Sequence, residues 1–208
     1  KPDLTYKRFI ESLIHKNYAV HAYKYTPQFD HQQLAIKAWK DFKNCRLSLS
    51  RRIGSSIPSI RIGHSLGCKL HLISPDGGRN CEKFISISFN NFSANKSIPL
   101  LKQITQRLEL SSEFSPSPER TLRIIEKTYS QKNNFLIKFK SDELDQTDKL
   151  FSCLKLRKED NSRGIILKGT HTIIASAGLR ENFLGDWADD DFKRDTIKKI
   201  SSLIDESN

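Results

Sequence analysis

The chain has 208 residues, with 35 lysines and arginines against 24 acidic residues, a net charge of +11 and 37% hydrophobic residues. This is the composition of an ordinary globular chain. No apolar run approaches the roughly 20 residues that a transmembrane helix requires, and the first residues lack the pattern of a signal peptide. We therefore expect a soluble chain with a single domain over residues 1–208, and an integral membrane protein is excluded.

The apolar pattern predicts helices and strands that alternate along the chain. In order, we expect a helix to residue 15 capped by Asp3 or Thr5, a strand over 18–25, a helix from Asp30 to about Arg46, a Ser-rich loop over 48–56, a strand over 57–62 and a helix over 68–73. Then follow a strand over 83–89, a helical stretch over 98–130 broken at 111–118, a strand over 134–139, a helix over 147–156, a strand over 164–168 and a helix over 189–204.

Alternation of this kind predicts the α/β class, with a mostly parallel sheet and helices on both faces. Residues 92–130 depart from the alternation and form a helical insertion, interpreted as a cap over the carboxyl ends of the strands. Apolar residues at helical spacing in this insertion either line an acyl pocket or belong to the core: Leu100, Leu101, Ile104 and Leu108.

A G-x-S-x-G motif, Gly63-His64-Ser65-Leu66-Gly67, stands between a predicted strand and a predicted helix. Small residues on both sides allow a sharp turn that projects the serine hydroxyl from the sheet, while the next backbone N–H faces the oxyanion. Ser65 is therefore the candidate nucleophile and the Leu66 N–H the candidate oxyanion donor. His64 is interpreted as a neighbour of the nucleophile and not as a base.

The same geometry requires an acid after a later strand and a histidine after the last one. Asp142 and Asp145 follow the strand over 134–139, and His171 follows the strand over 164–168. His171 would take the serine proton while a carboxylate orients the imidazole. We favour Asp142, which lies nearer the strand end; Asp145 is the alternative acid, and otherwise a cap of the next helix.

The other polar residues are interpreted as structural. Cys68 lies in the first turn of the helix after the motif and is a buried small hydrophobe in preference to a reactive thiol. The cysteines have no paired short spacing, which excludes a zinc ribbon or a disulfide framework and favours a reducing compartment. The remaining histidines lack metal-ligand spacing. No metal or organic cofactor is implied; the residues concerned are Cys45, Cys81, Cys153, His15, His21, His31 and His71.

Longer stretches of this sequence resemble the uncharacterised α/β-hydrolase-like proteins of cyanobacteria and plastids, the domain-of-unknown-function family numbered thirteen-fifty. The similar stretches are residues 23–35, 63–72, 85–99, 114–119, 136–146 and 169–171. The resemblance implies the hydrolase fold, the assignment of Ser65, Asp142 and His171, and a cytoplasmic (cyanobacterial) or plastid stromal location. It also implies a Gly-rich strand upstream of Lys1 that would supply a second oxyanion donor, and we expect this chain to lack it.

Together these features predict a serine hydrolase, esterase- or thioesterase-like, that acts on an ester, thioester or amide and takes a small-molecule or acyl substrate. An alternative is a catalytically inactive hydrolase-fold binding or assembly factor whose basic surface docks an acidic partner. The densest basic cluster spans Lys37 to Arg52 without a nucleic-acid motif. We interpret it as a solvated helix face in preference to a site for nucleic acid or an anionic membrane.

Overall fold

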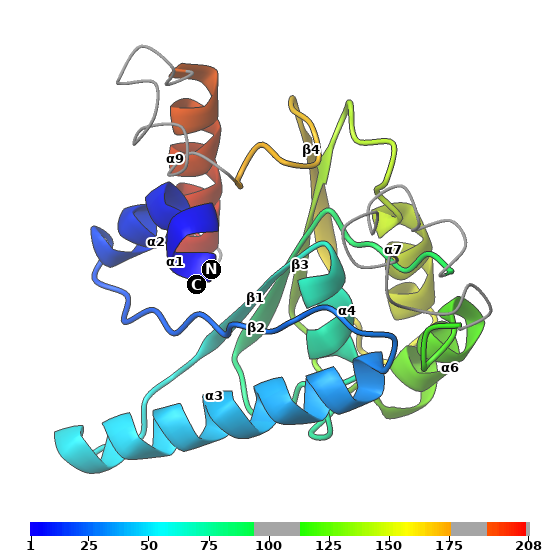
Figure 1. Ribbon diagram of the computed structural model, residues 1–208, viewed down its shortest axis with the longest axis horizontal. Coiled ribbons are helices and arrows are strands. Elements are labelled where there is room, and N and C mark those ends of the chain that lie inside the picture. Colours follow the sequence, from blue (N-terminus) through cyan, green and yellow to red (C-terminus); the bar gives the residue numbers. More distant parts are fainter. Residues whose placement is uncertain (94–112, 176–190, 207–208) are drawn as a thin grey trace. The chain divides into compact units, whose positions relative to one another are not determined.

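The computed structural model describes residues 1–93, 113–175 and 191–206 (Figure 1). The chain forms two compact units, one made of Tyr25–Lys168 and the other of Lys1–Lys24 together with Gly169–Asn208.

The larger unit contains a four-stranded sheet whose strands follow one another in the order β1-β2-β3-β4. The strands are β1 Ile60–His64, β2 Lys83–Ile87, β3 Asn134–Phe139 and β4 Arg163–Leu167. Every neighbouring pair is parallel, so that all four carboxyl ends lie at one edge. All five β2 residues are buried, as expected for a central parallel strand. The predicted parallel α/β architecture is confirmed.

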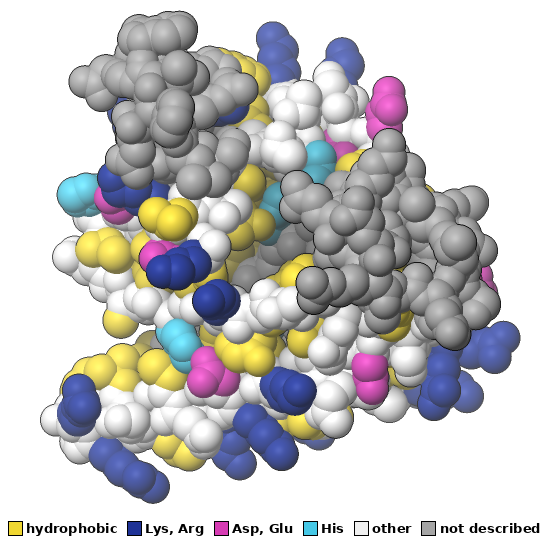
Figure 2. Space-filling view, viewed as in Figure 1, with side chains coloured by type: hydrophobic (Ala, Val, Ile, Leu, Met, Phe, Trp, Pro, Cys, Tyr) yellow, Lys and Arg dark blue, Asp and Glu magenta, His cyan; other side chains and the backbone are white. Residues whose placement is uncertain are grey.

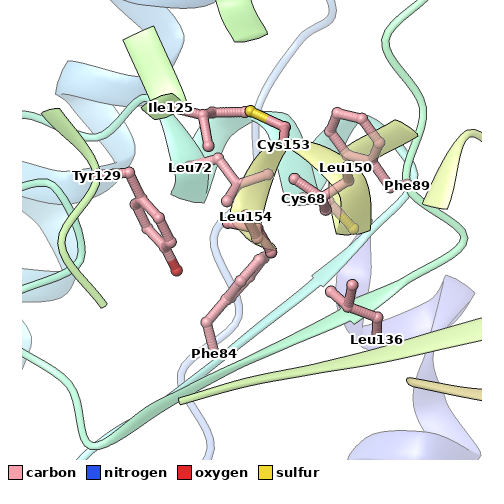
Figure 3. Close-up of a cluster of buried hydrophobic side chains, with 10 residues drawn as sticks. All are labelled: Cys68, Leu72, Phe84, Phe89, Ile125, Tyr129, Leu136, Leu150, Cys153 and Leu154. Atoms are coloured by element: carbon pink, nitrogen blue, oxygen red, sulfur yellow. The ribbon is translucent and has the colours of Figure 1, made fainter. Parts of the chain in front are cut away.

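Among its described residues, the helices of this unit are α3 His31–Ile53, α4 Leu66–Leu72, α6 Pro118–Thr128 and α7 Thr147–Lys155. The last three pack on one face of the sheet around Phe84 of β2 and Leu136 of β3 (Figure 3). Their buried side chains in this cluster are Cys68, Leu72, Ile125, Leu150, Cys153 and Leu154. A second cluster joins α3 to α4 through Leu34, Ala35, Leu70 and Ile73. These contacts fix α4, and with it the loop that precedes it.

Helix α3 begins where the sequence predicted, because the Asp30 carboxylate accepts a hydrogen bond of 2.8 Å from the N–H of Gln33. Its predicted end near Arg46 is wrong, since the helix continues to Ile53. Gly54, at φ 77°, ends it with a left-handed cap whose N–H donates to the Ser50 carbonyl. Ser48 and Ser50, which were expected in a loop, are therefore helical, whereas Ser55 and Ser56 follow the end of the helix.

The smaller unit contains α1 Pro2–Thr5, α2 Lys7–Ile14 and α9 Asp191–Glu206. Helix α2 packs against α9, and both bury one apolar face. Asp205 of α9 accepts from the Tyr18 hydroxyl at 3.1 Å and pairs with Lys16 at 3.4 Å. Asn17 adopts a left-handed conformation, φ 63°, just after α2, so that the predicted stop of the first helix is confirmed.

Further predictions of elements need correction. The first helix, expected as one helix capped by Asp3 or Thr5, is two helices, α1 and α2, whose N-cap residues Lys1 and Tyr6 make no side-chain capping hydrogen bond. Residues 18–25 form no strand, because they enter no backbone ladder with any described strand and their aromatic residues alone do not make one. The strand expected over 57–62 lies at Ile60–His64 instead, directly before the helix of the candidate motif. About half of the expected insertion, including its four apolar residues from Leu100 to Leu108, lies outside the described residues; its described part contains a helix at Pro118–Thr128.

Within residues 1–93, 113–175 and 191–206, no helix combines the length and the apolar character needed to cross a membrane.

Candidate active site

The candidate nucleophile occupies a sharp turn between β1 and α4. Ser65 has φ 55° and ψ −123°, backbone angles that a residue with a side chain adopts only under strain. Its N–H donates to the Ile87 carbonyl at 3.0 Å, and its carbonyl accepts from the Cys68 N–H at 3.0 Å. The first bond ties the turn to the end of β2 and the second starts the helix, so the strained conformation is held from both sides.

The two glycines of the motif differ in their surroundings. A Cβ on Gly63 would lie 2.6 Å from the Cys68 nitrogen and 2.7 Å from its Cα. The backbone near the end of β1 is therefore in close contact with the backbone at the start of α4. A Cβ on Gly67 would meet no described atom within 4 Å. The close approach that the motif needs therefore depends on Gly63, and the expectation that small residues are required on both sides is met on one side only.

Leu66 is the first residue of α4, and the Ser65 side chain does not cap this helix. A backbone N–H in the first helical turn has no partner within its own helix, so this position suits an oxyanion donor. Cys68, one residue after Gly67, has no exposed surface, and burial raises the pKa of its thiol to about 12. The interpretation of Cys68 as a buried hydrophobe is confirmed.

The loops after β2 and β3 lie at the same edge and are tied together. The Gln146 N–H donates to the Phe89 carbonyl at 2.8 Å, and the Asn91 N–H donates to Gln146 Oε1 at 2.9 Å. Asn91 Nδ2 donates in turn to the carbonyl of Pro118, the first residue of α6. Ser88, at the start of the β2 loop, has φ 51°. This network fixes the loop that carries both candidate acids.

The two candidate acids have different surroundings. Both Asp145 oxygens accept from Thr147, one from its N–H at 2.7 Å and the other from its hydroxyl at 3.0 Å. Burial raises the pKa of Asp145, and these hydrogen bonds oppose the shift. Asp142 Oδ1 accepts from the Leu144 N–H at 2.9 Å, in a turn of the loop itself. Asp145 is thus engaged by Thr147, the first residue of α7, although the N-cap position of this helix belongs to Gln146.

His171 follows β4 in a turn in which the Ile173 N–H donates to the Thr170 carbonyl. The residue belongs to the smaller unit, whereas Ser65 and Asp142 belong to the larger one. The structure thus places Ser65 and Asp142 at one edge of one sheet.

The sequence did not predict that a charged side chain of α4, that of Lys69, is buried. Lys69 is 1% exposed; its Nζ donates to the Pro116 carbonyl at 2.9 Å and lies 5.9 Å from the centre of the Phe114 ring. His31 stacks on the same ring at 4.3 Å. Burial, with a smaller effect of Lys69, lowers the pKa of His31 to about 3. The spacing of these residues along the chain does not predict that their side chains are in contact.

Among the residues that the structure describes, no group of three or more His, Cys, Asp or Glu side chains is arranged to hold a metal ion.

A parallel sheet with a strained serine between a strand and the following helix defines the α/β-hydrolase fold, and comparison with solved structures agrees. A monoacylglycerol lipase of Paleococcus ferrophilus is 15% identical, with a TM-score of 0.55, over 95% of this chain and 88% of the lipase. An esterase of Pyrococcus furiosus is 15% identical, with a TM-score of 0.57, over 99% of this chain and 74% of the esterase. The esterase domain of a Rhodothermus marinus protein is 18% identical, with a TM-score of 0.50, over 88% of this chain and 77% of the esterase domain.

The chain belongs to the family described as protein of unknown function (DUF1350), whose model matches residues 1–197. The resemblance stated from the sequence is confirmed at the level of the family and the fold. A search of curated protein sequences finds no match.

Proposed function

We propose that this protein is a serine hydrolase that cleaves an ester, thioester or amide with water. The observation that carries the proposal is the backbone of Ser65, which is held at φ 55° and ψ −123° at the carboxyl edge of the sheet. Strain of this kind persists where the surrounding structure imposes it, and it clusters at active sites. The solved structures with this fold include esterases and a monoacylglycerol lipase, which supports the same class of reaction.

In the proposed reaction, Ser65 Oγ attacks the acyl carbon while His171 accepts the hydroxyl proton. His171 then gives this proton to the leaving group, and an acyl-serine remains. Water attacks the acyl-serine with His171 again as the base, which releases the acid and restores the serine. Asp142 orients the imidazole, and the Leu66 N–H stabilises the oxyanion in both steps.

Asp142 is preferred to Asp145 because the carboxylate of Asp145 is already engaged by Thr147 through both oxygens. Removing the acid of a triad lowers turnover by about 10⁴-fold, whereas removing a carboxylate that accepts two hydrogen bonds in the structure costs about 1 kcal/mol of stability. Asp142→Asn should therefore lower the rate and spare stability. Asp145→Asn should lower the stability and leave the rate unchanged.

The test is the rate of labelling of the full-length protein by a fluorophosphonate, which reacts with activated serines and needs no known substrate. We expect labelling of the wild type, none of Ser65→Ala, and strongly slowed labelling of His171→Ala and Asp142→Asn. A folded wild type that is not labelled would overturn the proposal and favour the inactive binding or assembly factor. Slowed labelling of Asp145→Asn but not of Asp142→Asn would exchange the roles of the two acids.

A further inference from the structure

The loop that contains both candidate acids, residues 140–146, is anchored at both ends to parts of the chain beyond β3. At its start, the Lys140 N–H donates to the Leu167 carbonyl at the end of β4, at 2.8 Å. At its end, the Gln146 N–H donates to the Phe89 carbonyl in the loop after β2, also at 2.8 Å. The position of the two carboxylates therefore depends on the neighbouring strands as well as on β3.

The side chain of Gln146 makes a second connection at this end of the loop. Its Oε1 accepts from the Asn91 N–H at 2.9 Å, so that Gln146 is bound to the loop after β2 through both its backbone and its side chain. Asn91 is 5% exposed, and its Nδ2 donates to the Pro118 carbonyl at 2.9 Å. Asn91 thus connects three parts of the unit: the loop after β2, the acid loop and the start of α6.

The segment that ends at Pro118, residues 114–118, is itself bound to the helix that follows the nucleophile. Lys and Arg side chains line the surface along α3 (Figure 2), whereas Lys69 of α4 is 1% exposed and donates from Nζ to the Pro116 carbonyl at 2.9 Å. Ser115 is bound through its N–H and its carbonyl to the chain around the start of α3, with both hydrogen bonds at 2.9 Å. Segment 114–118 is therefore fixed to α4 and to α3.

We propose that Asn91 and Gln146 are positioning residues that hold the acid loop in a fixed place relative to Ser65. This inference rests on the proposed function. The contacts run from α4 through Lys69 to segment 114–118. From this segment they continue to Asn91 and on to Gln146. Because a misplacement of about 1 Å in an active site can lower the rate by about 10²-fold, loss of this connection should slow the reaction although every reacting group remains.

The test compares two glutamines that make the same kind of connection at opposite edges of the sheet. At the amino edge, Gln131 Oε1 accepts from the Asn133 N–H at 2.9 Å, and Gln131 Nε2 donates to the carbonyl of Cys81, 50 residues away in the sequence. Gln146→Met and Gln131→Met each remove such a connection and keep a side chain of similar length. We expect both to lower the free energy of unfolding in urea. Only Gln146→Met should slow fluorophosphonate labelling of the full-length protein, by about 10²-fold.

Three readouts separate positioning from a general loss of stability. Gln146→Glu keeps an oxygen that can accept from the Asn91 N–H, and it should recover most of the rate that Gln146→Met loses. In Gln146→Met, the midpoint of the labelling rate against pH should move to lower pH, because a displaced carboxylate stabilises the imidazolium of the base less. Gln131→Met should keep the wild-type midpoint. Asn91→Ala should slow labelling, and Asn91→Ala with Gln146→Met should be little slower than Gln146→Met alone, because the two residues act through one connection.

The outcomes separate this inference from the proposed activity. Labelling of folded Gln146→Met at the wild-type rate, or equal slowing in Gln131→Met, would overturn the inference and leave the hydrolase in place. A folded wild type that is not labelled would overturn both. If circular dichroism shows that Gln146→Met does not fold, Asn91→Ala is compared with Asn134→Ala, an asparagine of 3% exposure at the amino edge, and equal labelling rates of these two variants would overturn the inference.

Discussion

Replacing the candidate nucleophile by glycine should make the protein more stable. At φ 55° and ψ −123°, Ser65 bears a backbone strain of about 1–3 kcal/mol because of its Cβ. Glycine removes that strain and adds about 0.5–1 kcal/mol of cost through its freer unfolded chain. The hydrogen bonds to Ile87 and from Cys68 use backbone atoms only and survive the change. The balance is a gain of about 1 kcal/mol in the free energy of unfolding.

Ser65→Ala is the matched control, because it removes the same hydroxyl but keeps the Cβ and the strain. Equilibrium denaturation in urea, followed by circular dichroism, should rank Ser65→Gly above Ser65→Ala by about 1 kcal/mol, the reverse of the usual order of these two residues in a regular element. Both variants should fail to react with a fluorophosphonate. A glycine variant no more stable than the alanine variant would refute the claim that this turn is strained.

Three further predictions concern the same unit. Gly63→Ala should cost about 3 kcal/mol, because its Cβ would lie 2.6 Å from backbone, whereas Gly67→Ala should change denaturation little; equal effects would contradict the contact geometry. Asp76→Asn should cost about 3 kcal/mol by leaving Arg61 buried without its partner. Burial opposes ionisation of Asp76, but Arg61 lowers the pKa of this carboxyl well below the usual range. The free energy of unfolding of the wild type should therefore decrease as the pH drops below about 4, and the variant should lose this pH dependence. His31, with a pKa lowered to about 3, should destabilise the fold as pH falls below about 6.5, and His31→Phe should flatten this slope by about 1.4 kcal/mol per pH unit in a pH series of urea titrations.

The sequence predicted best what depends on neighbours in the chain. The strand at Asn134–Phe139 lies at the predicted residues, and the Asp30 cap starts α3 as expected. The errors arose where tertiary contacts decide. Residues 18–25 have the composition of a strand but do not pair in a ladder. The serines after Arg46 stay helical until Gly54 allows the chain to leave.

In the candidate site, too, the local features were predictable and the contacts between distant loops were not. Ser65 could be found because a strand, a sharp turn and a helix are local, and Asp142 follows from the order of parallel strands. The ties between Asn91 and Gln146 could not be found, because they join loops that are 55 residues apart. The hydrogen bonds from Thr147 to Asp145 could not be found either, because they depend on how Thr147 is oriented where α7 begins.

The two edges of the sheet are built in physically different ways. At the amino edge, charged groups are paired and bonded: Asp76 with Arg61, and Asp160 with Arg157 and Ser162. At the carboxyl edge, Ser65 and Ser88 have positive φ angles, and among the described residues the buried Ser88 Oγ and Asn91 Oδ1 have no hydrogen-bond partner. Backbone strain costs free energy, so a fold retains it where the conformation itself is used. The satisfied networks at the amino edge stabilise the sheet that holds the other edge in this state.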